Sequence, residues 1–377
     1  MNIYTIFIHS ILYSFIASVA VQLLYWASIF SRLAFYKQAP AAPSDSLKKP
    51  GVSVIVCGWN ELENLKKLIP RLLEQNYPVF ELIIVDDRSN DECYDFLLFE
   101  SFKHAQMRLV RINETPDHIT PKKYALSLGI KAAQYDIILL TDADCMPQSI
   151  DWISQMQQKF SAEKQVILGY SPYVYHKGLL NFMIRYETFY TAAQYFSFTL
   201  AGLPYMGVGR NLAYTKSLFI SNKGFHSHLN VLGGDDDLFV SEVATPKNVA
   251  ICIEKQAHVV SVPKTTFLSW YRQKRRHLSV GKHYTFRNKV MLGLMSLSQM
   301  MFWFTFFILL FSNEYIPWVL AGFLIRTSTQ LWMLQNIAKK IDTTIKWFFI
   351  PIFDLLYTIY YIIIGSSVSI SKQVRWN

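Results

Sequence analysis

The chain has 377 residues and a net charge of +10. Its length allows two domains, and because 51% of its residues are hydrophobic, part of it is expected to be embedded in a membrane. Its four cysteines form no CxxC pair, which argues against a disulfide framework and against a zinc site. The basic residues concentrate beside apolar segments, which favours contact with anionic lipid headgroups and argues against nucleic acid as a partner.

The N-terminal segment, residues 1–30, is nearly free of charge and long enough to cross a hydrocarbon core about 30 Å thick. A cleaved signal peptide is the alternative, but no basic residue precedes this run. The basic residues that follow it are Arg32, Lys37, Lys48 and Lys49. We therefore expect a transmembrane anchor over 1–31 and a proline-containing linker over 32–50. Because basic residues favour the cytoplasmic side, the next domain is expected in the cytoplasm, on a multi-pass protein of the inner membrane.

The middle of the chain, about 51–285, has the mixed, charged composition of a soluble domain. Short apolar, β-branched runs predict buried strands, and segments with helical periodicity separate them. The strand runs are VSVIVCGW, ELIIVDDRSND, RLVRI and YDIILLTDADC, and the helical segments are ENLKKLIPRLLEQ, DFLLFESFKHA and PKKYALSLGIKAA. Pro70 is expected to interrupt or kink the first helix, whereas Thr120 and Pro121 suit the start of the third. This alternation predicts an α/β fold with a mostly parallel sheet.

Polar side chains follow these strands at the point where each strand ends. In a parallel sheet such ends share one edge, where ligands bind near a topological switch point. The residues are Asn60, Glu61, Asp86, Asp87, Asp142 and Asp144. Asp142 and Asp144 are two residues apart, so in extended backbone they face the same side. Such a pair suits Mg²⁺ or Mn²⁺ together with substrate phosphates, and a solvated acidic turn is the alternative.

Simpler structural roles compete at the other strand ends. Asp86 and Asp87 could cap the next helix together with Ser89 and Asn90, or hydrogen-bond a uracil or a ribose. Glu61 could be only a favourable acid at a helix N-terminus, or could also line a nucleotide site.

Two lysines, Lys122 and Lys123, begin the third helix, where cations are not favoured. A diphosphate nearby would explain them, and ordinary solvation is the alternative. We therefore include Lys123 among the candidate donor-binding residues.

A second acidic group lies in VLGGDDDLFVSEV, where Asp235, Asp236 and Asp237 precede an apolar helix. Acids at this place stabilise the helix dipole, and that could be their only role. A carboxylate here could also take the proton from a hydroxyl that attacks an anomeric carbon.

Two further segments are candidates for contact with an acceptor. SWYRQKRRHLSVGKHY contains Gln273, Arg276 and His277, and it is either a basic helix at the membrane surface or a contact for the acceptor or the departing diphosphate. GVGRN lacks the third glycine of a dinucleotide fingerprint, so we reject a nicotinamide cofactor there. Its glycines instead suit close approach to an acceptor near Asn211.

Three apolar segments follow the middle domain and predict two or three transmembrane or interfacial helices within 286–377. They are 290–312, 315–336 and 346–368. Arg326 within the second is costly in lipid and should face protein, near Asp354 of the third.

Six ordered motifs resemble the family 2 glycosyltransferases of GT-A fold, over about residues 50–285. They are VSVIVCGWNE, LIIVDDRSND, PKKYALSLGIKAA, LLTDADC, GGDDDL and the stretch from Gln273 to His277. The resemblance implies inverting transfer from a UDP- or GDP-sugar to a lipid-linked or glycan acceptor. It places Asp86 and Asp87 at the nucleoside, and Asp142 and Asp144 at the diphosphate and metal.

The resemblance also makes Asp235 the general base, with Asp236 as the rival assignment. Two departures matter. The family's glutamate before the base is Gly234 here, and the tryptophan of the processive synthases is His277, which puts processive synthesis in doubt.

These departures keep alternatives to a glycosyltransferase open. One is a non-catalytic subunit that binds a sugar nucleotide within an envelope assembly complex. Another is nucleotidyl transfer, which would release pyrophosphate. The sequence identifies neither the sugar nor the acceptor.

Overall fold

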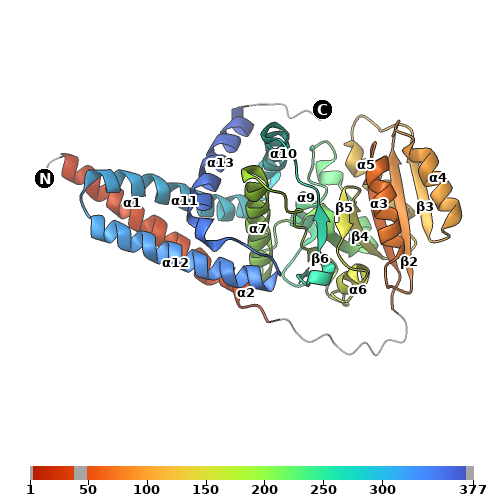
Figure 1. Cartoon of the computed structure of the whole chain (residues 1–377), viewed down its shortest axis with the longest axis horizontal. Helices are drawn as coiled ribbons and strands as arrows, with labels where there is room; N and C mark the ends of the chain where they lie inside the picture. The colour runs from red at the N-terminus through yellow and green to blue at the C-terminus, as the bar shows by residue number, and fades with distance from the viewer. Residues whose placement is uncertain (1–2, 38–48, 371–377) are drawn as a thin grey trace. The chain divides into compact units, whose positions relative to one another are not determined.

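The computed structural model describes residues 3–37 and 49–370, with side chains to residue 368, so Lys48 and most of the predicted linker lie outside the described residues. The chain divides into two compact units (Figure 1). One comprises Met1–Lys37 with Gly281–Asn377, and the other comprises Gln38–Val280. The second unit holds every motif of the resemblance.

A seven-stranded sheet organises the second unit, in the order β3-β2-β1-β4-β7-β6-β8. The strands are β1 (Val52–Gly58), β2 (Phe80–Asp87), β3 (Met107–Ile112), β4 (Ile137–Asp142), β6 (Val166–Gly169), β7 (Leu212–Thr215) and β8 (Val249–Cys252). β3, β2, β1 and β4 run parallel, β7 is antiparallel to both β4 and β6, and β8 is parallel to β6. A separate antiparallel ribbon pairs β5 (Cys145–Pro147) with β9 (Val259–Ser261). The predicted mostly parallel α/β fold is confirmed.

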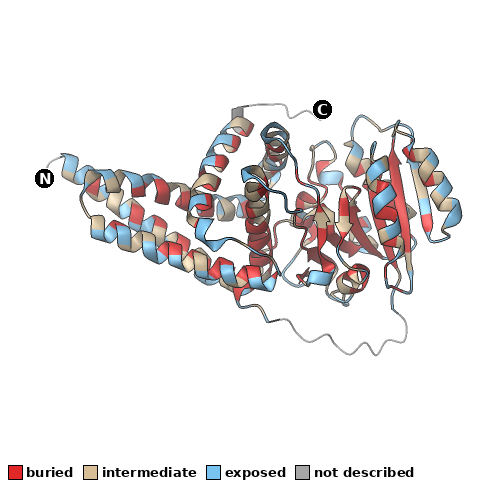
Figure 2. Ribbon diagram, in the orientation of Figure 1, coloured by how far each residue is buried: buried red, intermediate tan, exposed pale blue. Residues whose placement is uncertain are grey.

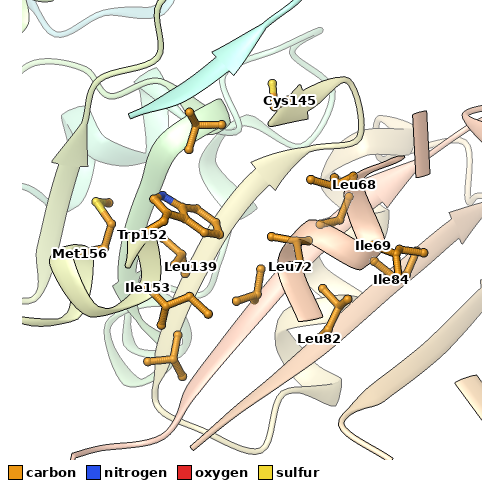
Figure 3. Close-up of a cluster of buried hydrophobic side chains, with 14 of the residues drawn as sticks. Leu68, Ile69, Leu72, Leu82, Ile84, Leu139, Cys145, Trp152, Ile153 and Met156 are labelled. Atoms are coloured by element: carbon orange, nitrogen blue, oxygen red, sulfur yellow. The ribbon is translucent and has the colours of Figure 1, made fainter. Parts of the chain in front are cut away.

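Helices lie around the sheet in the second unit, and its strands are mostly buried apart from the edge strand β3, as Figure 2 shows. They are α3 (Leu62–Leu73), α4 (Cys93–Lys103), α5 (Pro121–Ala132), α6 (Trp152–Gln157), α7 (Leu179–Leu200), α8 (Lys216–Ser221), α9 (Asp237–Val243) and α10 (Phe267–Val280). Side chains of α3 and α6 pack on one face of the sheet, with Leu68, Leu72 and Trp152 in one buried cluster (Figure 3). Burial of these apolar side chains stabilises the packing of α3 and α6 on the sheet.

The expected interruption at Pro70 is wrong, because α3 runs without a break from Leu62 to Leu73. Proline removes a single hydrogen bond from the helix, and the amphipathic face of α3 offsets that loss. Leu65, Leu68, Ile69 and Leu72 are all buried on this face.

Helix α5 packs on the opposite face of the sheet. Val54 and Val56 of β1 belong to the cluster with α3, whereas Ile55 between them faces Gly129 of α5. A Cβ at Gly129 would lie 2.7 Å from Ile55 Cγ2, so the close approach of α5 requires glycine there. The position of α5 matters because its first turn reaches the edge of the sheet where the parallel strands end.

The first unit is helical. Its helices are α1 (Ile3–Tyr25), a π-helical turn (Trp26–Phe30), α2 (Ser31–Ala34), α11 (Phe286–Ser312), α12 (Ile316–Lys340) and α13 (Ile350–Ile370). Three described helical stretches are long and apolar enough to cross a membrane, namely Ile3–Ala34, Phe286–Ser312 and Trp347–Val368. The N-terminal stretch therefore extends beyond the predicted end of the anchor at residue 31.

A buried polar network joins the helices of this unit. Arg326 Nη1 of α12 lies 2.8 Å from Asp354 Oδ2 of α13, and both side chains are 1% exposed. Asp354 also accepts hydrogen bonds from Gln330, Gln299 and Trp303, at 2.7, 2.9 and 2.8 Å. The predicted proximity of Arg326 and Asp354 is confirmed, and the pair faces protein as an intramembrane charge should.

Candidate active site

The parallel strands bring three groups of acids to one edge of the sheet. In the strand register Gly58 of β1 pairs with Asp86 of β2, and Cys57 of β1 pairs with Asp142 of β4. Asp86 and Asp142 therefore lie on either side of the end of β1. This register puts the predicted nucleoside and metal residues within reach of one ligand.

The carboxylates that follow β4 form a group suited to a cation. One ligand atom from each of Asp142, Asp144 and Cys145 lies within 4.8 Å of the others. The Cys145 thiol donates to Asp144 Oδ1 over 3.3 Å. Two carboxylates suit a hard dication such as Mg²⁺ or Mn²⁺, so the residues present fit a divalent metal. Cys145 was not predicted as part of this group.

Lys122 joins this group to the second acidic cluster. Its Nζ lies 2.9 Å from Asp142 Oδ1 and 3.3 Å from Asp235 Oδ2. Burial would lower the pKa of Lys122, but Asp142, Asp235 and Asp236 raise it well above its ordinary value. Burial would likewise raise the pKa of Asp142, and Lys122 with Arg210 and Arg276 lowers it. The site therefore holds opposite charges in contact.

Lys123, the lysine placed at the donor in our prediction, has a different role. Its side chain is fully buried, and its ammonium donates to the backbone carbonyls of His228 and Val231. Lys123 thus anchors the loop before Asp235 and cannot also face a diphosphate. The structure moves this prediction to Lys122, one residue earlier, because successive residues point about 100° apart around a helix.

The two candidate bases of the second acidic cluster differ in their hydrogen-bond partners. Asp236 accepts from the backbone N–H groups of Gly209 and Asp237, each over 2.8 Å, so each of its carboxylate oxygens has a backbone partner. Burial and the adjacent Asp235 raise the pKa of Asp236. Asp235 is 7% exposed and has the Lys122 contact on one oxygen. Asp236 is the more exposed residue, but Asp235 has fewer direct partners among the described residues, which leaves its carboxylate the freer to accept a proton.

Gly234, where the resemblance implies a glutamate, occupies a position with little room for a side chain. Its φ is +81°, and a Cβ there would lie 2.6 Å from Leu238 Cδ1. A side chain at this position would be strained by the backbone and would also displace Leu238.

The loop after β1 is tied to the loop after β2. Asn60 has a φ of 56°, its N–H donates to Ser89 Oγ over 2.9 Å, and its Oδ1 accepts from the Asn90 N–H over 2.8 Å. The capping role suggested for Ser89 and Asn90 is wrong, because α4 begins at Cys93 with Glu92 at the N-cap position. These two residues instead hold Asn60 at the edge of the site.

The acids of these two loops differ in how they are paired. Asp86 is 1% exposed, and its Oδ1 has no hydrogen-bond partner among the described residues. Asp87 forms an ion pair with Arg88 at 2.8 Å. Burial raises the pKa of Glu61, a hydrogen bond from Asn64 lowers it, and Asp144 raises it further. Glu61 therefore lies in the electric field of the metal group.

Asn211 is not available to an acceptor. It is fully buried, accepts from Trp152 Nε1 over 3.0 Å, and donates to the carbonyls of Tyr170 and Ala257, each over 2.8 Å. The prediction of an acceptor contact at Asn211 is therefore replaced by a structural role. The preceding residue, Arg210, is the one whose charge acts on Asp142.

Helix α10 carries the last group of candidates. Lys274 is buried in an ion pair with Glu187 of α7, which fixes the helix within the second unit. Arg276 contributes to the low pKa of Asp142. The His277 residue is exposed by surface area, yet protein atoms around its ring, and then the charges of Lys274 and Arg276, lower its pKa below the ordinary value. His277 is therefore uncharged at neutral pH, while Gln273 is half-buried on the same helix.

Comparisons with known proteins bear on the predicted resemblance. Residues 53–220 match the family described as Glycosyl transferase family 2. This match and the named relatives confirm the predicted resemblance to the family 2 glycosyltransferases.

Two of these relatives have named functions. The chain is 28% identical over 130 residues to poly-β-1,6-N-acetyl-D-glucosamine synthase of Staphylococcus epidermidis, which covers 32% of this chain and 29% of that protein. It is 27% identical over 195 residues to glycosyltransferase AglE of Haloferax volcanii, which covers 49% of this chain and 59% of that protein. The matches thus span less than two thirds of either relative.

A solved structure shows the same fold. It is a mannosyltransferase from Pyrobaculum calidifontis in complex with GDP-mannose and Mn²⁺, with a TM-score of 0.59 and 18% identity. The match covers 97% of this chain and 100% of that chain. The fold is therefore of GT-A type.

Proposed function

We propose that this chain is an inverting glycosyltransferase that moves a sugar from a UDP- or GDP-sugar to a lipid-linked or envelope glycan acceptor. The observation that carries the proposal is the cluster in which Lys122 bridges Asp142 of the metal group and Asp235 of the second acidic group. Because one ammonium group contacts both carboxylates, the candidate metal ligand Asp142 and the candidate base Asp235 lie close together.

The donor would bind along the edge of the sheet. The free oxygen of buried Asp86 suits an N–H of the base, and Asp87 suits the ribose. Asp142 and Asp144 would hold Mg²⁺ or Mn²⁺, which supplies positive charge to the diphosphate when bound. The mannosyltransferase with the same fold was solved with GDP-mannose and Mn²⁺, which supports this class of donor and metal.

The acceptor hydroxyl would be activated by Asp235. This carboxylate takes the hydroxyl proton while the acceptor oxygen attacks the anomeric carbon from the side opposite the diphosphate, so the configuration inverts. Asp236 keeps the base in place through its two backbone hydrogen bonds. Neutral His277, with Gln273 and Arg276 on the same helix, would contact the acceptor or the departing diphosphate.

The acceptor is proposed to be presented at a membrane. Three stretches of the first unit have the length and composition of membrane spans. A named relative, the synthase of S. epidermidis, makes a polysaccharide, which supports a cell-envelope glycan. The basic residues that flank these spans support a cytoplasmic position for the second unit, at the inner membrane.

Sugar transfer by the purified full-length chain tests the proposal. A panel of UDP- and GDP-sugars is incubated with MnCl₂ or MgCl₂ and a membrane lipid extract, and both the released nucleotide and the glycosylated lipid are measured by mass spectrometry. Asp142→Asn and Asp235→Asn should each lower transfer by about 10² to 10³-fold, because each removes a group that acts in the transition state.

Asp95→Asn is the matched control, since Asp95 is an exposed carboxylate on α4, outside the site. It should transfer sugar like the unaltered chain. Full activity in the Asp142 and Asp235 variants would contradict the assignment. Release of pyrophosphate would indicate nucleotidyl transfer, and binding without turnover would indicate a non-catalytic subunit.

A further inference from the structure

Arg210 has an incompletely paired guanidinium beside the metal group. Its Nη1 is buried and has no hydrogen-bond partner in the described part of the chain. The guanidinium lies over the Tyr173 ring, 4.3 Å from the ring centroid. A buried donor that lacks a partner costs free energy, so such a group is expected to have a partner when the protein acts.

The backbone around Arg210 is held at three consecutive residues. The Gly209 N–H donates to Asp236 Oδ2 over 2.8 Å. The carbonyl of Arg210 accepts from Thr141 Oγ1 over 3.0 Å, and Thr141 directly precedes Asp142. Asn211 is fully buried with three hydrogen bonds. The turn is thus fixed to both acidic groups. Because its backbone is already ordered, binding of a ligand to Arg210 would cost little conformational entropy.

The charge of Arg210 is not cancelled by a direct ion pair. Burial would lower its pKa, but Tyr173, Cys145, Asp142 and Asp144 raise it, so the guanidinium stays charged. None of these acids lies within ion-pair distance of it in the described residues. The side chain therefore offers a positive charge and a free N–H donor beside the group that would hold the metal.

We propose that Arg210 binds the diphosphate of the donor and neutralises it as it leaves. The proposal rests on the proposed function and adds a residue to it. A guanidinium presents parallel donors that match phosphate oxygens, and the stacked ring of Tyr173 holds its plane.

The chemistry balances as a single displacement. The bond between the anomeric carbon and the diphosphate oxygen breaks, and its electron pair goes to that oxygen. The acceptor oxygen forms the new bond to the anomeric carbon, and its proton passes to Asp235. Arg210 stabilises the charge that develops on the diphosphate.

Binding by the full-length chain in detergent tests the role of Arg210. The probes are UDP and GDP with MnCl₂, and uridine and guanosine, which carry no phosphate. Arg210→Met should weaken binding of the preferred diphosphate by about ten- to a hundredfold, and Arg210→Lys by about tenfold, because lysine keeps the charge but loses the paired donors. Nucleoside affinity should change less than about twofold, within the error of such comparisons.

Arg185→Met is the matched control. The Arg185 guanidinium lies over the Tyr175 ring, 5.3 Å from the ring centroid. The substitution therefore removes a similarly placed arginine from the same unit. Its diphosphate affinity should equal that of the unaltered chain. Unchanged diphosphate binding in Arg210→Lys and Arg210→Met would overturn the proposal and leave Arg210 a packing residue.

Two further outcomes separate this proposal from the proposed function. If the unaltered chain binds neither UDP nor GDP, the proposed function fails and the role of Arg210 fails with it. If the unaltered chain binds a diphosphate and transfers sugar while the Arg210 variants do both equally well, only the role of Arg210 fails. Should the methionine variant unfold, the lysine variant, which keeps the long stem and the charge, decides the question.

Discussion

Asp354 of the helical unit and Asp142 of the sheet unit are the same residue type in opposite situations. Asp354 is almost fully buried and satisfied by Arg326, Gln330, Gln299 and Trp303. Asp142 is 32% exposed and has one direct side-chain partner in the described part of the chain, Lys122. The first carboxylate has no capacity left for a ligand, whereas the second does.

This difference separates a structural acid from a candidate catalytic one. A buried carboxylate whose two oxygens are both engaged by buried partners strengthens packing, and removing it leaves those partners unpaired. A site that binds a metal or a phosphate must leave some groups incompletely paired. Judged by burial and charge alone, Asp354 would be the stronger candidate for a functional residue. Because its oxygens already have four partners, Asp142 is the better candidate.

The largest effect is expected at Asp354. Asp354→Leu should lower the free energy of unfolding by about 3–5 kcal/mol, because it leaves Arg326 buried without its ion pair. Thermal unfolding in detergent micelles measures this loss.

The double variant Arg326→Met with Asp354→Leu sharpens the test. It should be more stable than Asp354→Leu alone, since no unpaired charge remains buried. Equal stability of the single variant and the unaltered chain would show that the network contributes nothing.

The two lysines of α5 repeat the contrast, and Lys123 should give the intermediate effect. Burial lowers the pKa of Lys123 to about 8, against an ordinary value of 10.5. Between about pH 8 and 10.5 the unfolded chain holds a proton that the folded chain has lost. The free energy of unfolding should therefore rise with pH across this window, by up to about 3 kcal/mol.

Chemical unfolding at several pH values, with and without Lys123→Met, measures this contribution. The variant should lack the rise with pH, and it should be less stable at pH 7 because two loop carbonyls lose their donor. Lys131→Met, which removes an exposed lysine at the end of the same helix, should keep the rise. Parallel pH profiles for the unaltered chain and the Lys123 variant would contradict the assignment.

The smallest effect is expected at Ser89. Ser89→Ala removes the acceptor for the Asn60 N–H, which lies in an exposed loop where water can replace it. We expect a loss of about 0.5–1 kcal/mol in the free energy of unfolding and a weaker donor affinity, measured by chemical unfolding and by calorimetry. Ser101→Ala on α4 serves as the control, and it should change neither quantity. A nucleotide affinity equal to that of the unaltered chain would show that the tie between the two loops does not position the donor.

Much of the fold could be predicted because local patterns determine it. Apolar β-branched runs that end in acids identified β1, β2 and β4, and their parallel order follows from the helices between them. The antiparallel strand β7 and the ribbon of β5 with β9 could not be predicted. They are short, and their partners lie far away in the sequence.

At two positions the residue that faces the candidate site lies one residue before the one predicted. Lys122 and Lys123 are identical in type, and their roles differ only because they point to different sides of α5. Arg210 and Asn211 adjoin in a tight turn, so that the arginine stacks on Tyr173 while the asparagine is buried against Trp152. Side-chain direction in a turn depends on tertiary contacts, which the sequence pattern does not contain.

Gly234 also constrains how relatives of this chain can diverge. A glutamate introduced at residue 234 alone would meet Leu238 and an unfavourable backbone conformation, since φ there is +81°. A smaller residue at 238 would relieve the contact but not the backbone conformation, so the effects of substitutions at residues 234 and 238 are expected to be coupled. Gly234 thus ties the sequence of the turn before α9 to the first turn of that helix.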